Sequence, residues 1–404
     1  MAAIVLVAAG AVSRAGAQEA SGGRRTTEKI DLIADLIYDS NVAGAGAYVA
    51  SLRHIKPSDE IFTPAVSLDL AQRIGRQSVY LGGTVGYDFH RVNTVLNRER
   101  IDLKSGVVGR IGFCRGQVSG KYGRHQSELS SLELVGGLTG PSNIKNTETA
   151  KSLDLSATCG NSIGFAPNFS VSETWSNNTS IPFTQNDSRT LSASAGIVYQ
   201  QPSFGELNFF GSYTRSDFVN RHFFIGTVIK DDGYEFYAGG VSFQRKIGAR
   251  LLGNASVSYT SLHSYLAAGG NYNSLTYSAN LNYRFDSKLG ANLAFSHSTS
   301  PSGRIGATFS VNRTLMGEID YSVTSRLRTK LGASYARHSY PHSTIPVGVD
   351  LTEEAINREF VGASYQLNRR LLVSFDSSYL RRVANSTGLS YSAVQAGVTV
   401  RTTF

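Results

Sequence analysis

The last stretch of the chain, residues 389–404, reads LSYSAVQAGVTVRTTF and alternates between apolar and polar side chains. In steps of two, one face carries Val394, Ala396, Val398, Val400 and Phe404. The opposite face carries Gln395, Gly397, Thr399, Arg401 and Thr403. A period of two predicts a β-strand with one apolar and one polar face. Such a strand fits the edge of a soluble all-β domain as well as the wall of a membrane-spanning barrel, so the rest of the chain has to decide.

A terminal amphipathic strand that ends in Phe resembles the closing strand of bacterial outer-membrane β-barrels. In those proteins the strand also serves as the assembly signal. The resemblance therefore implies this role for Phe404 and implies the barrel-assembly machinery as a partner.

The composition favours one large sheet over several helical domains. The 404 residues include 41 Gly, 20 Tyr and 20 Phe but only 2 Met and 1 Trp. After the N-terminus there is no run of about 18 apolar residues, so the sequence predicts no transmembrane helix. Apolar residues scattered along a chain of this size suit a transmembrane β-barrel, in which alternate residues face lipid and lumen.

The start of the chain, MAAIVLVAAGAVSRAGAQEA, reads as a secretory signal. An apolar core precedes the small-residue site Ala15-Gly16-Ala17, although the usual basic residues before the core are missing. We expect a signal peptide at 1–17, a flexible periplasmic lead at 18–28 and a barrel at 29–404. The expected location is the bacterial outer membrane, with outer-membrane lipids and lipopolysaccharide as surroundings.

Amphipathic segments of about 10–16 residues follow one another to the end of the chain, separated by turn-rich sequence. They predict an all-β fold, a transmembrane antiparallel up-and-down β-barrel of about 18 strands, with 16 as the alternative. The predicted segments are 29–38, 59–72, 77–91, 98–112, 113–126, 147–160, 167–178, 187–200, 205–218, 232–246, 249–262, 271–285, 288–299, 307–324, 328–340, 354–368, 371–382 and 389–404.

The connections between these segments alternate in length. Short links such as 74–76 and 202–205 alternate with longer ones. The longer ones include 39–58, 127–146, 219–231 and 341–353. Transmembrane barrels have short periplasmic turns and longer extracellular loops. The alternation therefore predicts an even strand count, with both chain ends on the periplasmic side.

Alternation within the segments predicts which side chains line the interior. In 98–112, Ile101 and Leu103 share one face, whereas Arg100 and Asp102 share the other. Because charged groups cannot be packed dry without partners, we expect the charged face to line a wet lumen and the apolar face to contact lipid. The predicted lumen-lining residues are Asp88, His90, Arg100, Asp102, Lys104, Arg110, Lys121, Asp154, Arg284, Glu318, Asp320, Lys330 and Asp376. These residues carry both signs of charge, which predicts either a transverse electric field across the lumen or ladders of paired charges. The alternative is that the charge pairs only stabilise the barrel wall.

Eighteen strands leave a channel wide enough for water and extended polymers. The 127–146 connection carries four apolar residues, Leu132, Leu134, Val135 and Leu138. This connection is the expected constriction if it folds inward, and an extracellular flap if it does not.

The two cysteines, Cys114 and Cys159, lie at corresponding ends of neighbouring segments, equidistant from the centre of the 127–146 connection. Both share parity with apolar neighbours. An antiparallel hairpin would bring them together on one face near the periplasmic rim, and the periplasm is oxidising. The sequence leaves open a cross-strand disulfide and two buried free thiols, because a register slip of one residue would remove the bond.

No catalytic or metal-binding motif stands out. The chain has no GxSxG and no HExxH sequence, and two cysteines cannot form a CxxC-type zinc site. The net charge of +9 invites a nucleic-acid interpretation, but the basic residues are spread over all segments instead of one patch. We expect no enzyme activity, no metal, no cofactor and no nucleic-acid partner.

The opening of the predicted barrel carries a further resemblance. Ile37-Tyr38-Asp39-Ser40-Asn41-Val42 is followed by an aspartate-led segment, 59–68, that holds Pro64. This arrangement resembles the β-barrel porins encoded with bacterial exopolysaccharide and capsule synthesis genes. The resemblance implies an outer-membrane barrel that passes a surface polysaccharide outward, with a periplasmic polysaccharide-export protein as partner. It carries no catalytic residues, and it assigns Asp39, Ser40 and Asn41 no role beyond shaping the end of the first hairpin.

The leading functional hypothesis is therefore an outer-membrane channel for export of exopolysaccharide or capsule, with the polysaccharide as cargo. The alternatives are a general diffusion porin or uptake channel for small hydrophilic solutes, and a structural barrel that does not conduct. Polymer export predicts a continuous wide path that no inward loop seals.

Overall fold

The computed structural model describes residues 26–127, 129, 145–160, 163–225, 228–265, 271–301, 309–341, 351–385 and 387–404. In these ranges the chain is mostly β-strand. They also contain one α-helix, α2 (Ala47–Leu52), and the short 3-10 helices η1 (Thr94–Leu96), η4 (Ile181–Asn186) and η6 (Thr387–Leu389). Among the described residues, no helix is long and apolar enough to cross a membrane.

Eighteen strands make up the sheet. They are β1 (Thr27–Asp39), β2 (Asp59–Ile74), β3 (Gln77–His90), β4 (Arg98–Ile111), β5 (Cys114–Gln126), β6 (Thr147–Cys159), β7 (Gly164–Asn178), β8 (Ser188–Gln201), β9 (Gly205–Ile225), β10 (Val228–Ile247), β11 (Leu251–Ser264), β12 (Asn271–Arg284), β13 (Leu289–Pro301), β14 (Phe309–Ser322), β15 (Leu327–Ser339), β16 (Glu353–Gln366), β17 (Leu371–Ala384) and β18 (Tyr391–Thr403).

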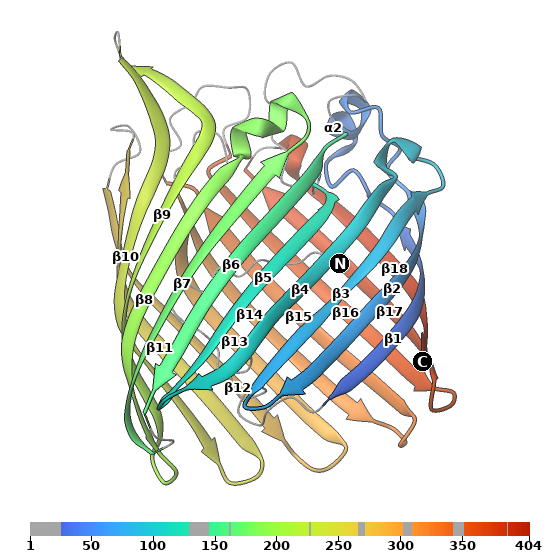
Figure 1. Cartoon of the computed structure of the whole chain (residues 1–404). Helices are drawn as coiled ribbons and strands as arrows, with labels where there is room; N and C mark the ends of the chain where they lie inside the picture. Colours follow the sequence, from blue (N-terminus) through green and yellow to red (C-terminus); the bar gives the residue numbers. More distant parts are fainter. Residues whose placement is uncertain are drawn as a thin grey trace.

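The sheet closes into a barrel (Figure 1). Each strand pairs antiparallel with its neighbours in the chain, and β1 pairs with both β2 and β18. The seam between β1 and β18 runs from Asp31 opposite Thr403 to Asp39 opposite Gln395. Closure leaves no sheet edge with unpaired backbone groups, which a strand in lipid could not tolerate. The fold confirms the prediction of eighteen strands over the alternative of sixteen.

The two ends of the barrel differ. One end, lower in Figure 1, has tight turns such as the link between β2 and β3; we call it the short-turn end. The other end carries the longer connections, with α2, η1 and η4 at the upper rim; we call it the long-loop end. Phe404 lies toward the short-turn end, where its backbone N–H donates to the carbonyl oxygen of Ile30 over 2.8 Å.

The hairpin of β9 and β10 corrects one prediction. We expected a long connection at 219–231, but β9 continues to Ile225 and β10 begins at Val228. Their pairing extends through this segment, with a register shift between Asp231 and Asp232. The segment is rich in aromatic and β-branched residues, which favour strands. Pairing between β9 and β10 then satisfies the backbone N–H and C=O groups of the segment, even where this hairpin extends beyond the neighbouring strands.

The outer face of the barrel is apolar and the inner face is polar. In β12, Leu275, Tyr277 and Leu281 are exposed on the outside, and Ser278 and Asn280 have the opposite parity. An eighteen-stranded barrel is too wide for side chains to fill its centre. Phe236 and Leu262 nevertheless turn inward, where they are directly opposite in the register and pack in one buried cluster. In the described part of the chain, clusters of buried apolar side chains lie at the long-loop end.

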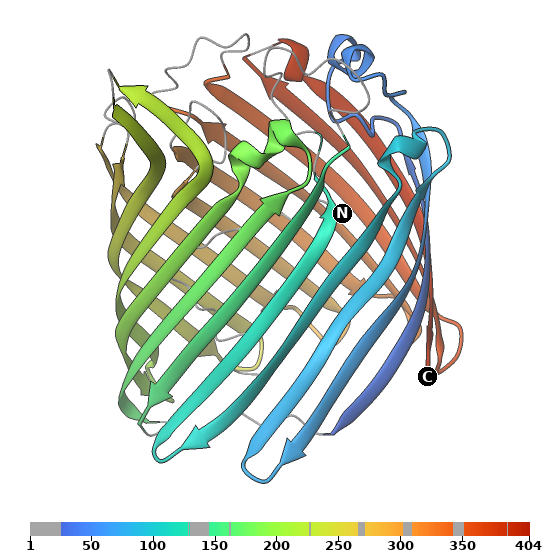
Figure 2. The same ribbon diagram turned by 45° about the horizontal axis from the view of Figure 1, so that its top comes forward.

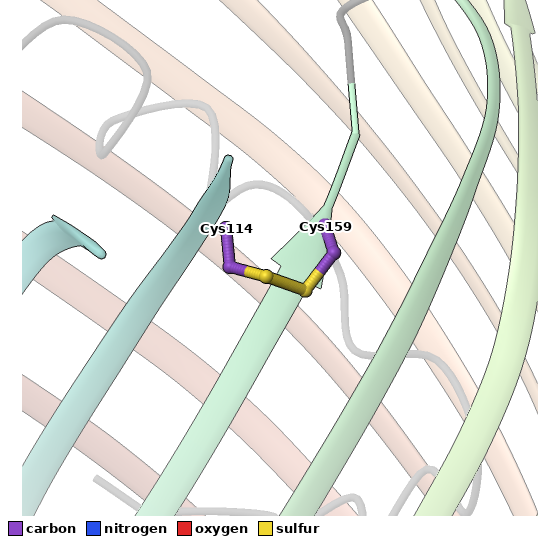
Figure 3. The surroundings of a disulfide bond; sticks show 2 residues. All are labelled: Cys114 and Cys159. Atoms are coloured by element: carbon purple, nitrogen blue, oxygen red, sulfur yellow. A yellow bond between two sulfur atoms is a disulfide. The ribbon is translucent and has the colours of Figure 1, made fainter. Parts of the chain in front are cut away.

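A disulfide joins β5 to β6 at the short-turn end (Figure 3). Cys114 and Cys159 stand directly opposite each other in the register, with their Cα atoms 3.9 Å apart and their sulfur atoms 2.04 Å apart. Of the two possibilities that the sequence left open, the structure contains the bonded form. The covalent loop has a sequence separation of 45 residues.

Replacing both residues, Cys114→Ser with Cys159→Ser, should destabilise the barrel without changing its fold. For a covalent loop of this length, the restriction of the unfolded chain is worth about 4 kcal/mol. Thermal unfolding of the detergent-solubilised protein, followed by heat-modifiable mobility on gels, measures the effect. The reduced wild-type protein is the matched control and should unfold at the same lower temperature; an unchanged unfolding temperature in both would contradict the prediction.

Candidate functional site: the interior of the barrel

A cavity of about 1060 Å³ lies inside the barrel next to the short turns. Its walls include Gln117 and Ser156 on one side, and Asn282 and Asn292 on the other. All four have the parity opposite to the exposed apolar residues of their strands, so the polar face is the one that lines the interior. Amide, hydroxyl and charged groups on a pore wall can exchange hydrogen bonds with water and polar solutes.

Two neighbouring pairs of predicted lumen-lining residues come together as ion pairs. Arg100 Nη2 on β4 lies 3.4 Å from Asp88 Oδ2 on β3, and Lys121 Nζ on β5 lies 3.4 Å from Asp154 Oδ2 on β6. The Asp88 carboxylate also accepts a hydrogen bond of 2.6 Å from the Thr63 hydroxyl. These partly exposed pairs neutralise one another's charge and contribute little stability each.

A third pair spans a whole strand. Lys330 Nζ on β15 lies 2.8 Å from Asp376 Oδ1 on β17, across β16. The strand between them carries Gly362 at the crossing point, where a Cβ atom would meet both side chains. The glycine therefore leaves the space in which this pair forms.

Four other predicted residues surround the cavity, namely Arg110, Arg284, Glu318 and Asp320. Arg110 comes from β4 and Arg284 from β12, whereas both carboxylates come from β14. Arg284 and Asp320 stand at the same level of the wall, on either side of Gly290 in the register. The transverse field across the lumen stays a prediction.

Asp102 and Lys104 complete the predicted set on β4. They have the inward parity of Arg100, and Lys104 stands opposite Lys121 in the register. Neither Asp102 nor Lys104 forms an ion pair with another described residue.

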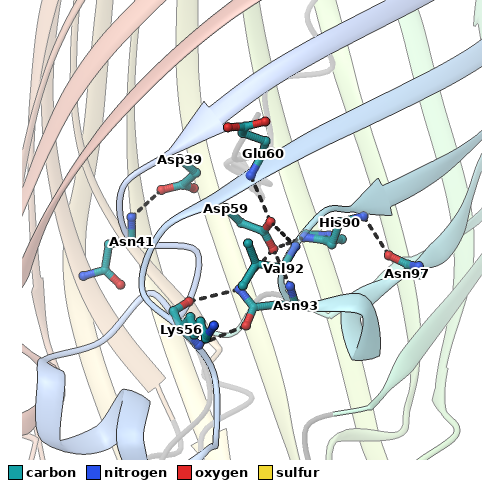
Figure 4. Close-up of polar contacts among 9 residues, drawn as sticks. All are labelled: Asp39, Asn41, Lys56, Asp59, Glu60, His90, Val92, Asn93 and Asn97. Atoms are coloured by element: carbon teal, nitrogen blue, oxygen red, sulfur yellow. Dashed lines mark hydrogen bonds and ion pairs between the residues drawn. The ribbon is translucent and has the colours of Figure 1, made fainter.

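His90 is part of a buried network at the long-loop end (Figure 4). Its Nδ1 lies 3.1 Å from Asp59 Oδ2, and the Asp59 side chain is fully buried. Asp59 also accepts hydrogen bonds from the backbone N–H groups of Val92 and Asn93 and from the Asn93 amide. His90 therefore helps to hold the β3–β4 connection in place and is distant from the cavity at the short-turn end.

Asp39, Ser40 and Asn41, at the end of β1, stabilise the seam between β1 and β18. Asp39 accepts hydrogen bonds from the backbone N–H of Asn41 over 2.7 Å and from the Gln395 amide on β18 over 2.8 Å. The Ser40 hydroxyl accepts one of 2.7 Å from the backbone N–H of Val394. The Asn41 amide donates to the carbonyl oxygen of Ser392 on β18 over 3.4 Å. Asp39, Ser40 and Asn41 thus tie the end of β1 to the last strand, a role that the sequence did not predict.

One sector of the inner wall is almost free of charge. Within the described residues, the inward positions of β7–β13 carry charge only near the ends of the strands. Most of the other inward positions carry hydroxyl or amide side chains, and apolar residues such as Phe210 and Phe236 interrupt them. Neighbouring strands exchange hydroxyl hydrogen bonds, as between Ser170 and Ser194 and between Ser258 and Thr276, over 2.8 and 2.7 Å. The charged inward residues predicted from the sequence do not extend into the middle of this sector, for which the alternating Ser and Thr residues were the available signal.

Loop 1 (residues 40–58) covers part of the long-loop rim, where Figure 2 shows α2 close to η6. The backbone N–H of Gly46 donates to the carbonyl oxygen of Gly388 over 3.0 Å. On its other side, apolar residues of loop 1, including Ala50 and Ile55, pack in one buried cluster with residues of three other connections, including Leu96. Loop 1 thus joins neighbouring connections into one assembly at the mouth.

Arg53 holds this assembly together from the inside. It is 3% exposed, and its Nη1 donates to the carbonyl oxygens of Ala43 and Leu129 over 2.8 and 3.0 Å. Burial and the nearby Arg382 guanidinium on β17 lower the pKa of Arg53 to about 10, so it keeps its charge at neutral pH. Arg382 is itself buried and paired with Glu354 over 2.5 Å.

The predicted constriction by 127–146 lies mostly outside the described residues, and so do Leu132, Leu134, Val135 and Leu138. The part of that connection that the structure does describe, Leu129, packs in the same cluster as loop 1. Loop 1 is thus one of the described segments at this rim, and the sequence predicted it only as a long connection.

Within the described residues, no three His, Cys, Asp or Glu side chains gather in a group that could hold a metal ion. The interior groups are arranged as ion pairs, hydroxyl ladders and amides along a passage. Such groups can exchange hydrogen bonds with water and polar solutes.

The barrel is similar in fold to solved outer-membrane structures. OccK2 (OpdF) of Pseudomonas aeruginosa in complex with glucuronate has a TM-score of 0.51 and 12% sequence identity, covering 94% of this chain and 98% of that chain. A second structure of OccK2 has a TM-score of 0.50 and 13% identity, covering 93% and 98%. The outer membrane protein OpdK of the same organism has a TM-score of 0.49 and 12% identity, covering 94% and 99%.

Closed topology, apolar exterior and polar interior together define a porin-like β-barrel. More particularly, residues 211–404, from within β9 to the end of the chain, match the family described as "Putative beta-barrel porin 2". The comparison with curated proteins finds no match.

Proposed function

We propose that the protein is an outer-membrane channel for the passage of small hydrophilic solutes. The observation that carries the proposal is the polar cavity of about 1060 Å³ inside a closed eighteen-stranded wall. The fold similarity to OccK2, which was solved in complex with glucuronate, supports a passage for small solutes over one for polymers. The proposal corresponds to the alternative hypothesis from the sequence, a porin or uptake channel for small solutes, and not to the leading hypothesis of polysaccharide export.

In the proposed orientation, the short turns face the periplasm and the long loops face outward, as in barrels of this class. The secretory signal at 1–17, the lead at 18–28, the assembly machinery that reads Phe404, and the surrounding lipids and lipopolysaccharide are parts of the same proposal. The predicted lumen-lining residues other than His90 would then act by setting the field along the passage.

Reconstitution of the full mature chain into planar bilayers and liposomes tests the proposed function. We expect stable single-channel currents in potassium chloride, and liposome swelling in monosaccharides that falls steeply with solute size. A barrel that shows its folded gel mobility but passes neither ions nor sugars would be the non-conducting structural barrel, and the proposal would be wrong.

Export of a surface polysaccharide is the second candidate. The neutral sector of β7–β13 favours it, because hydroxyl and amide groups can exchange hydrogen bonds with successive sugar hydroxyls. Export would require a periplasmic polysaccharide-export protein as partner. Deletion of the gene, followed by quantification of surface polysaccharide, separates the two candidates: an unchanged amount excludes export.

A further inference from the structure

Two arginines on the inner wall face each other without a counter-charge. Arg110 near the end of β4 and Arg115 near the start of β5 are directly opposite in the register, on the two sides of the tight turn. Residues in this position have their Cβ atoms about 5 Å apart, and like charges there repel. Neither arginine forms an ion pair with any residue that the structure describes, whereas Arg100 and Lys121 higher on the same strands each have a carboxylate partner.

The carboxylates of the cavity lie elsewhere on its wall. Glu206 belongs to β9, and Glu318 and Asp320 belong to β14. Between β5 and these strands stand β6 to β8, whose inward positions near the cavity carry Thr158, Gln200 and other neutral side chains. The arginine pair therefore presents an uncompensated positive charge to the cavity.

The neighbours of the pair are hydrogen-bonding groups. Thr158 on β6 is opposite Arg115 in the register, and Ser156 is opposite Gln117. The Gln117 amide donates to the Tyr80 hydroxyl over 3.0 Å, which holds its side chain on the wall. All but Tyr80 line the same cavity. Guanidinium groups bind carboxylates by paired hydrogen bonds, and hydroxyl and amide groups bind sugar hydroxyls.

We propose that Arg110 and Arg115, with Gln117, Ser156 and Thr158 beside them, form a binding site for acidic sugars in the periplasmic part of the channel. The two guanidinium groups take the carboxylate, and the bound anion relieves their mutual repulsion. The amide and hydroxyl groups take the ring hydroxyls. The inference rests on the proposed function and adds to it a solute class, the carboxylated monosaccharides.

The experiment measures ion selectivity and channel block on the reconstituted full-length mature chain. At low salt, where screening is weak, we expect the wild-type channel to prefer chloride over potassium. We expect sodium galacturonate to block the current at lower concentration than galactose or inorganic phosphate. In Arg110→Gln with Arg115→Gln, the half-blocking concentration of galacturonate should rise at least about tenfold.

A variant with the same loss of charge elsewhere is the matched control. Arg91→Gln with Lys151→Gln removes two cations that do not line the cavity and should leave both block and selectivity unchanged. Arg91 follows β3 at the long-loop end, and Lys151 has the outward parity of Leu153 on β6. A second control, Lys330→Gln with Asp376→Asn, removes a neutralised pair from the lumen and should also leave the selectivity unchanged. If either control weakens galacturonate block as much as the arginine variant does, the assignment to Arg110 and Arg115 is wrong.

The outcomes separate this inference from the proposed function. A wild-type channel that conducts without preferring chloride, and that galacturonate blocks no better than galactose, overturns the acidic-sugar site and leaves the channel standing. Stronger block by phosphate than by galacturonate overturns the assignment to sugars. If no current is seen, the proposed function fails, and calorimetric titration of the detergent-solubilised barrel with galacturonate decides the site: binding that the arginine variant abolishes supports it, and no binding overturns it.

Discussion

Deletion of Phe404 is expected to remove most of the protein from the outer membrane while leaving the conductance of the remaining barrels unchanged. The Phe404 side chain has the outward parity of Val398 and Val400 and is 63% exposed, so it does not reach the lumen. Its backbone N–H closes the last hydrogen bond of the seam, to Ile30. The deletion thus removes both the terminal aromatic group and the final contact between β18 and β1, and an unsealed edge in lipid is strongly unfavourable.

Fractionation of cells and gels that separate folded from unfolded barrels measure this effect. Thr402→Ala is the matched control, because Thr402 lies on the same outer face two residues earlier and should be present at normal levels. Phe404→Tyr retains an aromatic end and should assemble almost normally. Normal outer-membrane amounts of the deletion variant would count against both the assembly role of Phe404 and the proposed location.

The strands could be predicted because their determinants are local. The two-residue period of segments such as 389–404 reports directly on which side chain faces out, and tight turns separate one strand from the next. The same reasoning placed Cys114 and Cys159 at matching ends of one hairpin, and only the register remained to be decided. Where strand and loop preferences compete, as at 219–231, the prediction was wrong because pairing with a partner strand decided the outcome.

The interior was only partly predictable because its pairs depend on register across several strands. Parity placed Lys330 and Asp376 on the inner face, but their contact across β16 also requires the gap at Gly362. The facing of Arg110 and Arg115 was within reach of sequence reasoning, since the tight turn at 112–113 sets their register. The predicted lumen-lining set nevertheless contains Arg110 and not Arg115.

The assembly at the mouth is the part that sequence patterns least predict. Loop 1 shows no regular alternation of apolar and polar residues. Its conformation is fixed by contacts with residues far away in the sequence: Arg53 binds Leu129, 76 positions later, and Gly46 binds Gly388, near the other end of the chain. A sequence shows that a long connection exists at 39–58, but its tertiary contacts decide whether it stands away from the barrel or packs at its rim.

Arg53→Ala is expected to release loop 1 from the rim and to raise the conductance. The substitution removes the guanidinium that binds the carbonyl oxygens of Ala43 and Leu129, and hydrogen bonds from a buried charged group are together worth about 3 kcal/mol. Hydrogen exchange at the α2 amides is the direct measurement. The Ala50 N–H, which donates to Gly46, should exchange about 100-fold faster, because each 1.4 kcal/mol of local stability is worth about a factor of ten.

Arg91→Ala is the matched control for Arg53→Ala at the same rim. Arg91 pairs with Glu60 over 2.8 Å, but its side chain is 71% exposed, so the pair contributes about 1 kcal/mol or less. Its loss should change neither the exchange in α2 nor the single-channel current. If Arg53→Ala speeds exchange while the current stays at the wild-type level, loop 1 does not narrow the passage, and its assembly only stabilises the rim.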